Sequence, residues 1–192
     1  MVDEGAIHLD LLRDIQRSGG EMWSPMGYQL TEETIVESMA DPLRTPSALQ
    51  TPERKASLIA DLGSTKRRAR SMALTQLAGW DPDPEVAAAL RPLLRTGDEH
   101  QRWEAASAMV RQRATDTLDE VLDVVRRASP AEGGSNGTML LPVQIALELA
   151  ELIGPDAVAR VKSMSSSWRG PEPTKLPRHE RQWADELDAM LG

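Results

Sequence analysis

The feature that most constrains the fold is a constant offset between helix caps and apolar positions. A shift of 32 residues aligns the pairs Arg70 and Arg102, Ala73 and Ala105, Leu77 and Met109, Asp83 and Thr115, Leu90 and Leu122. A bundle around a single core does not require such an offset. Stacked helical hairpins do, because each hairpin must bury its apolar face against the next one. The sequence therefore predicts a series of repeated helical hairpins.

Helix start and stop signals divide the chain into helices, and no segment alternates as a strand would. Phe is absent and Tyr28 is the single Tyr, so the apolar residues are mainly Ala, Leu, Val and Met, a composition that favours helices. The protein is predicted to be all-α. The expected helices are 3–18, 31–39, 51–62, 64–78, 83–95, 98–113, 115–128, 140–153, 156–166 and 177–191.

Residues that break helices mark the connections between them. Residues 43–50 are expected to be a connector, 129–137 a flexible loop and 168–176 a Gly/Pro linker. Pro92 lies inside the helix predicted for residues 83–95, where it should kink the axis.

The turn Asp81-Pro82-Asp83-Pro84-Glu85-Val86, between paired helices that carry an Arg and small Ala positions, resembles the short bacterial form of the HEAT-repeat family. The resemblance covers about residues 51–166. It implies an α-α superhelix of about four hairpins, with residues 1–50 as an N-terminal cap and connector, 51–168 as the repeats, and 169–192 as a linker and capping helix. One departure is Lys162, which aligns with the inward positions of Leu90 and Leu122.

Composition excludes several classes of function. The chain has 192 residues, a formal charge of −8 and no Cys, so it has no disulfide framework and no thiolate metal site. Its three His are isolated, and no motif of a phosphate loop, zinc protease or serine hydrolase is present. No apolar run approaches 18 residues, and the acidic start is unlike a signal peptide. We expect a soluble cytoplasmic protein that needs no metal and no cofactor.

The second helices of the predicted hairpins would form a concave surface of mixed charge. The candidate partner-binding residues are Arg91, Arg95, Asp119, Asp123, Arg126 and Arg127. Asp119 and Asp123 have the i, i+4 spacing of a carboxylate metal site. Because Asp123 aligns with Arg91 one repeat earlier, the preferred interpretation is an ion pair between Arg91 and Asp123 instead.

Three further features have two interpretations each. Lys66, Arg67, Arg68 and Arg70 at a helix start are either an anion site or a solvated face. The loop with Trp23, Met26 and Tyr28 either packs as a cap or is an exposed docking element. Trp80 and Trp103 are either core residues, which we favour, or interface anchors.

These observations predict a non-catalytic adaptor, scaffold or regulatory subunit that binds a protein or peptide partner through its mixed-charge surface. The sequence favours this role over an enzyme without excluding activity. The alternative is a nucleic-acid-binding protein similar to the HEAT-like DNA glycosylases. A charge of −8 argues against that alternative unless the basic residues converge on one side.

Overall fold

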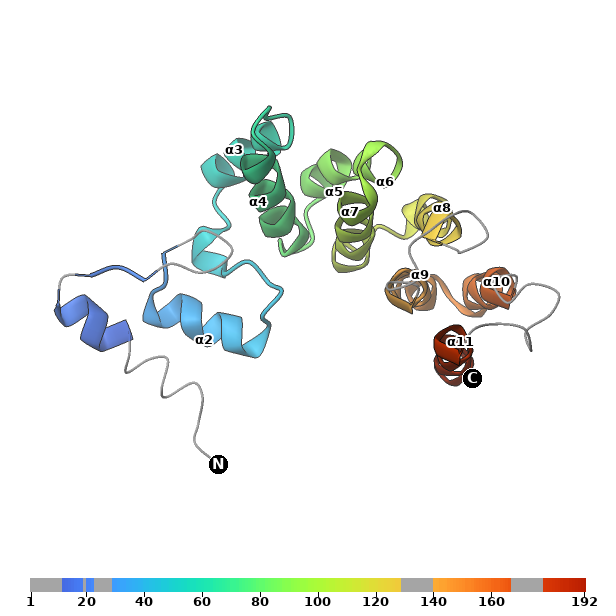
Figure 1. Ribbon diagram of the computed structural model, residues 1–192. Coiled ribbons are helices and arrows are strands. Elements are labelled where there is room, and N and C mark those ends of the chain that lie inside the picture. Colours follow the sequence, from blue (N-terminus) through green and yellow to red (C-terminus); the bar gives the residue numbers. More distant parts are fainter. Residues whose placement is uncertain (1–11, 19, 23–28, 129–139, 167–177) are drawn as a thin grey trace. The chain divides into compact units, whose positions relative to one another are not determined.

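A computed structural model describes residues 12–18, 20–22, 29–128, 140–166 and 178–192. In these residues the regular elements are helices, which confirms the all-α prediction (Figure 1). The chain separates into two compact units, Met1–Ala89 and Leu90–Gly192. The division lies inside the predicted repeat region, at the end of one helix.

The first unit contains short helices whose starts follow from their capping residues. Residues 12–17 are helical. The elements after them are α2 (Glu32–Ala40), η1 (Ser47–Leu49), α3 (Pro52–Leu62), α4 (Arg67–Ala78) and α5 (Pro84–Leu90), whose last residue belongs to the second unit. The Thr31 side chain caps α2 in a reciprocal pair with Thr34. Thr51 caps α3, and Pro52 occupies its first turn.

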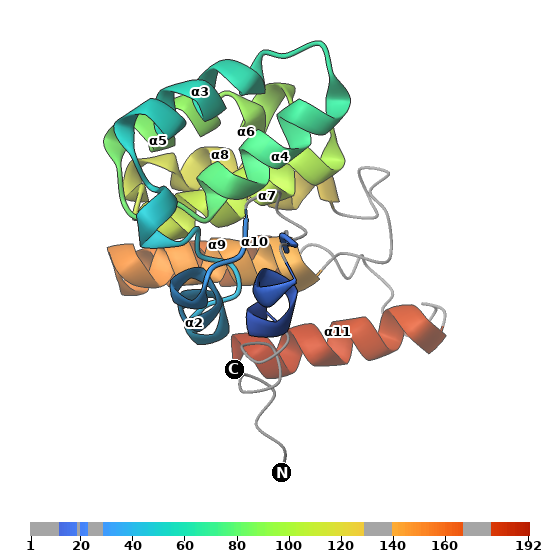
Figure 2. The ribbon, with the colours of Figure 1, turned by 90° about the vertical axis from the view of Figure 1, so that its left-hand side faces the viewer.

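In the first unit α3 packs against α4, and Figure 2 shows the two helices side by side. The connector, residues 43–50, contains η1 and holds the turn after α4. The Thr45 backbone N–H donates to the Gly79 carbonyl at 2.7 Å, and the Thr45 hydroxyl donates to the Gln76 carbonyl at 2.6 Å. Arg44 makes two hydrogen bonds to Asp81, at 2.7 and 2.5 Å. The connector is therefore part of the packed structure of this unit.

The second unit contains the remaining helices. They are α6 (Leu93–Thr96), α7 (Glu99–Arg111), η2 (Thr115–Thr117), α8 (Leu118–Ala128), α9 (Leu140–Ile153), α10 (Pro155–Ser166) and α11 (Arg178–Leu191). The chain breaks between α5 and α6 at Arg91-Pro92, as expected for a proline inside a helical sequence. Asp98 starts α7 with a capping box, its side chain accepting from the Gln101 N–H at 2.9 Å.

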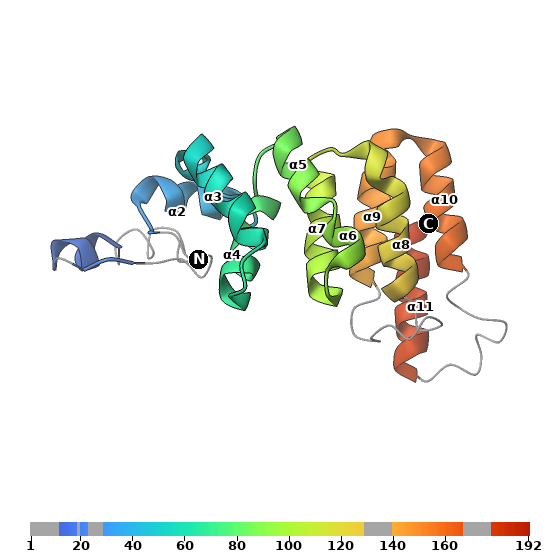
Figure 3. The same ribbon diagram turned by 90° about the horizontal axis from the view of Figure 1, so that it is seen from above.

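Helices of the second unit pack in two rows. Figures 1 and 3 show α8 beside α9 and α9 beside α10, and contacts also join α6 to α7 and α8, and α7 to α9. In Figure 1, α6, α8 and α10 follow one another on one side, with α7 and α9 on the other. Apolar side chains from both rows are buried between them, among them Leu94, Met109, Val121, Val125, Val143 and Leu149. The core of this unit consists of aliphatic side chains.

Most expected helix limits agree with the structure to within two residues. The predicted helix at 64–78 begins later, at Arg67. Lys162, the residue that departs from the repeat pattern, is exposed, and the neighbouring Val161 is buried. Trp80 is only 3% exposed, as a core residue should be, and Trp103 is half-buried.

Candidate functional site

Helix α8 carries most of the candidate partner-binding residues because its two faces differ sharply. Leu118, Val121 and Val125 are buried, and the charged side chains lie on the opposite face. Along that face the acids Asp119 and Glu120 occupy the first turn and Arg126 and Arg127 the last. This order suits the helix dipole, whose amino end favours negative charge and whose carboxyl end favours positive charge.

Ion pairs link α8 to the chain on both sides of it. At the break between α5 and α6, Arg91 donates to Asp116 at 2.7 Å and to Glu120 at 3.1 and 2.8 Å. From α6, Arg95 donates to Glu120 at 3.2 Å. From α10, Arg160 donates to Asp119 at 2.5 Å. The charged side chains thus connect three successive helices of one row.

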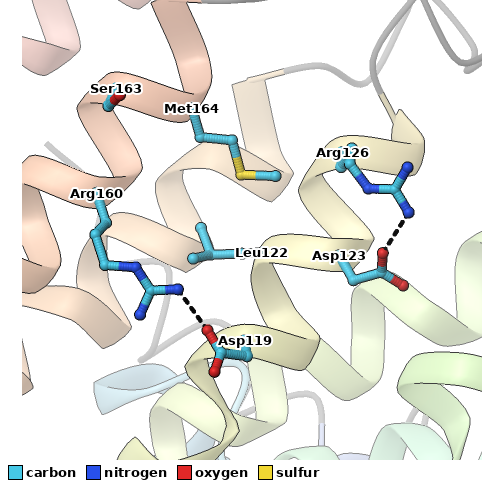
Figure 4. Close-up of a pocket in the computed structure, with 7 residues that line it drawn as sticks. All are labelled: Asp119, Leu122, Asp123, Arg126, Arg160, Ser163 and Met164. Atoms are coloured by element: carbon cyan, nitrogen blue, oxygen red, sulfur yellow. Dashed lines mark hydrogen bonds and ion pairs between the residues drawn. The ribbon is translucent and has the colours of Figure 1, made fainter.

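Two hollows lie along this row and share Asp119 and Asp123. The first has a volume of about 470 Å³. It is lined by Arg91, Arg95 and Asp116, which precede α8, and by Asp119, Glu120, Asp123 and Arg127 of α8. The second, of about 410 Å³, is lined by Asp119, Leu122, Asp123 and Arg126 of α8 and by Arg160, Ser163 and Met164 of α10 (Figure 4). We refer to the two hollows together as the α8 groove.

Electrostatic interactions in the α8 groove stabilise the charged forms of Arg91 and Asp123. Hydrogen bonds to Glu120 and then to Asp116 raise the pKa of the Arg91 guanidinium. Burial alone would raise the pKa of the Asp123 carboxyl. The hydrogen bonds and positive charges of Arg126 and Arg127 outweigh that effect and hold the pKa below its ordinary value. Both of these side chains are therefore ionised at neutral pH.

The structure brings all six candidate partner-binding residues to the α8 groove, but one expected pairing is wrong. Asp123 forms its ion pairs with Arg126, at 2.7 Å, and with Arg127 on the same helix. Arg91 reaches Asp116 and Glu120 instead. Glu120 lies three residues before Asp123, about one turn earlier on the same side of α8, so the pairing is displaced by one turn.

The remaining candidate residues lie elsewhere or outside the described residues. Lys66, Arg67 and Arg68 are exposed at the start of α4, and Arg70 donates to the Ser64 carbonyl at 2.6 Å. Three of the four cations thus face solvent, while the fourth holds the backbone of the preceding turn. The loop residues Trp23, Met26 and Tyr28 lie outside the described residues.

Several residues of the α8 groove were missed by the sequence analysis: Asp116, Glu120, Leu122, Arg160, Ser163 and Met164. The repeat itself contained the signal for part of this set. An offset of 40 residues, which allows for the loop at 129–137, aligns Glu120 with Arg160 and Asp123 with Ser163. Applying this alignment to the charged residues of α8 would have identified residues of α10 as part of the site.

In the described part of the chain, no group of three or more His, Asp or Glu side chains is arranged to hold a metal ion. Asp119 and Asp123, the pair with metal-site spacing, each bind arginine. Among the described helices, none is both long enough and apolar enough to cross a membrane.

Comparisons with known proteins give no family assignment. No protein-family model matches the chain, and neither a curated protein nor a solved structure matches it. The geometry of the groove and the sequence pattern are therefore the basis for inferring a function.

Proposed function

We propose that this protein is a non-catalytic interaction module, an adaptor, scaffold or regulatory subunit, that binds a protein or peptide partner in the α8 groove. The observation that carries the proposal is the groove itself. Charged residues from three successive helices line two adjoining hollows, and all six residues selected for their position on one face are among them. Hollows of 300–1,000 Å³ are of the size that binding sites have.

The charges in the groove suit a polypeptide partner better than nucleic acid. The residues that line the two hollows include five arginines and four carboxylates, so that charges of both signs lie close together. Carboxylates among the arginines would repel a phosphate backbone, which a nucleic-acid-binding surface attracts with uninterrupted positive charge. The lining residues also include no aromatic side chain on which a base could stack.

We further propose that the hairpins form the HEAT-like superhelix that the sequence resembles. A repeated contact supports this. Arg70 and Arg102, which align at the offset of 32 residues, each donate to a carbonyl of the turn before their own helix: Ser64 at 2.6 Å and Gly97 at 2.7 Å. A repeat unit that keeps both its apolar positions and this contact is typical of stacked hairpins.

The ion pairs of the groove allow a partner to replace them at low cost. Arg95 is 69% exposed, and Asp119 and Arg160 are 78% and 56% exposed. The pair of Asp119 and Arg160, in which both side chains are exposed, contributes about 0–1 kcal/mol. Partner groups can therefore compete for these side chains without loss of the fold, and the binding should weaken as salt increases.

The test is to identify a partner and then to measure its binding to a groove variant. The tagged chain is purified from its native host, partners are identified by mass spectrometry, and the affinity of the purified partner is measured. The variant with Arg95→Glu and Arg160→Glu should bind at least ten-fold more weakly than the wild type. A control with Arg67→Glu and Arg68→Glu, which reverses the same number of exposed charges on α4, should bind as the wild type does.

Two results would overturn the proposal. One is a partner that binds the groove variant as tightly as the control. The other is binding of a fluorescent DNA or RNA oligonucleotide at low salt that the groove variant abolishes, which would assign the groove to nucleic acid.

A further inference from the structure

The second hollow of the α8 groove differs from the first in its chemistry. All of the residues lining the first hollow are charged. The second contains two apolar side chains, Leu122 and Met164, on helices that face each other. Figure 4 shows Met164 of α10 extending into the space between the two helices, with Leu122 of α8 opposite it. Leu122 is only 6% exposed, so the apolar floor of this hollow is fixed in the core.

Ion pairs stand on both sides of this apolar floor. Arg160 and Asp119 form one pair at 2.5 Å, and Arg126 and Asp123 form the other at 2.7 Å (Figure 4). Each pair presents both a positive and a negative group. An apolar centre surrounded by polar groups is the arrangement of an interface hot spot, in which the rim excludes water from a central anchor.

On the basis of the proposed function, we propose that the second hollow is the anchor site for the partner. It takes one large apolar side chain, which packs on Leu122 and Met164. The partner segment carries both basic and acidic residues next to this anchor. Charge complementarity identifies that segment, because each ion pair offers a carboxylate to a partner cation and a guanidinium to a partner carboxylate.

The properties of Met164 and the size of the hollow match this role. Met164 is half-buried, unbranched and polarisable, so it can adjust to the shape of an inserted side chain. A volume of about 410 Å³ leaves room for a single large side chain together with the backbone that carries it. The anchor gives affinity, and the two ion pairs fix the direction and register of the bound segment.

The experiment uses the intact chain and peptides selected from a random twelve-residue phage library. Selected peptides are synthesised with a fluorescent label, and their dissociation constants are measured by anisotropy. We expect the selected sequences to share one large apolar residue next to charged residues of both signs. Replacing that residue by Ala should weaken binding at least ten-fold.

The protein variants test the hollow directly. Met164→Asp should weaken binding at least ten-fold, and Met164→Gln, which keeps the length of the side chain, should weaken it less. The matched control is Leu152→Asp, since Leu152 is an exposed apolar residue of α9 that does not line the groove. It should leave binding unchanged. Circular dichroism melting of each variant checks that the fold is kept.

The outcomes separate this inference from the proposed function. Suppose that the selected peptides no longer bind the variant with Arg95→Glu and Arg160→Glu but bind Met164→Asp with the wild-type dissociation constant. This result would overturn the anchor site while still supporting the interaction module. A selection that yields only peptides indifferent to all groove variants, or none at all, would overturn both.

Discussion

The aligned helices α4 and α7 have the same buried apolar positions but are held in place differently. Ala73 and Leu77 in α4 are buried, as are their counterparts Ala105 and Met109 in α7. The difference lies one residue earlier than Leu77, where α4 has Gln76 and α7 has Ala108. Gln76 is 2% exposed, and its side chain accepts from the Arg54 guanidinium at 2.8 Å. Helix α4 is therefore held in part by a buried polar contact at a position where α7 has Ala.

The turns that follow the two helices show the same contrast. After α4, the connector supplies hydrogen bonds: Thr45 donates to the Gly79 carbonyl, and Gln50 accepts from the Asp81 backbone N–H at 3.1 Å. After α7, the turn closes on its own helix, with the Ala114 N–H donating to the Met109 carbonyl at 2.9 Å and Arg113 at a φ of 51°. At these turns the apolar positions follow the repeat, whereas the polar contacts depend on the segment that lies beside each helix.

The largest expected effect is at the position shared by Leu90 and Leu122. Leu90 is fully buried, and Leu90→Ala should lower the free energy of unfolding by about 2–5 kcal/mol, because the core around it relaxes only partly into the cavity. Leu122→Ala should cost less, since Leu122 lines a hollow that is already open to solvent. Urea unfolding of both variants measures the difference. A loss below about 1 kcal/mol for Leu90→Ala, or the reverse order, would contradict the comparison.

The close approach of the connector to α4 predicts the next effect. A Cβ atom added at Gly79 would lie 2.3 Å from the Leu43 carbonyl oxygen and 2.8 Å from the Thr45 nitrogen. Because both atoms belong to the backbone, Gly79→Ala should force the connector away from the turn and cost about 3 kcal/mol. Gly63→Ala is the control, since its Cβ would meet nothing closer than 3.5 Å. Thermal unfolding of the two variants should therefore differ clearly, and equal melting temperatures would show that the connector is loosely held.

A smaller effect is expected from exchanging the residues that distinguish α4 from α7. Gln76→Leu removes the acceptor of the Arg54 guanidinium and should cost about 1–3 kcal/mol, as a polar group loses its partner in the core. Ala108→Gln places an amide in an aliphatic core and should cost a similar amount. In the double variant with Arg54→Met and Gln76→Leu, part of the loss should be recovered, because neither polar group remains. Additive losses in urea unfolding would mean that Arg54 and Gln76 act independently.

The sequence predicted the elements whose signals are local. Thr51 with Pro52, and Asp98 with Gln101, define their helix starts with neighbouring residues alone. Four of the six candidate partner-binding residues lie together for a similar reason, since Asp119, Asp123, Arg126 and Arg127 are spaced along a single helix.

The sequence could not predict the contacts that depend on how one helix is placed against the next. Arg91 pairs with Glu120 and Asp116 instead of Asp123. An offset of 32 residues aligns Arg91 with Asp123 but does not say which turn of α8 lies nearest to Arg91. In α10, the offset of 40 residues aligns Lys162 with Leu122, yet Lys162 is exposed and its neighbour Val161 is buried. Neither the partner of Arg91 nor the buried residue of α10 follows from the helix caps or from the spacing of apolar residues.

The smallest expected effect is the pH dependence contributed by the cap of α5. Asp83 accepts from the Lys55 ammonium at 2.7 Å and from the Glu85 and Val86 N–H groups, whereas the aligned residue before α8, Thr115, cannot ionise. The hydrogen bond from Lys55 is the main reason that the pKa of Asp83 is lowered, with the backbone hydrogen bonds adding to it against the effect of burial. A carboxyl with a lowered pKa in the folded state binds protons more readily when unfolded. Its stabilisation is therefore complete above the unfolded pKa of about 3.9 and is lost as the pH falls through the lower folded value.

Asp83→Asn separates the charge from the cap, because Asn caps helices as well as Asp does. The variant should lose about 0–1 kcal/mol at pH 7. Melting temperatures measured between pH 5 and pH 2.5 should then fall less steeply for Asp83→Asn than for the wild type. Lys55→Met should reduce the slope in the same way, since it removes the cation that lowers the pKa of Asp83. If both variants kept the wild-type slope of melting temperature against pH, the acid sensitivity of the protein would come from carboxylates other than Asp83. The ionisable cap of α5 would then make no measurable difference between α5 and α8.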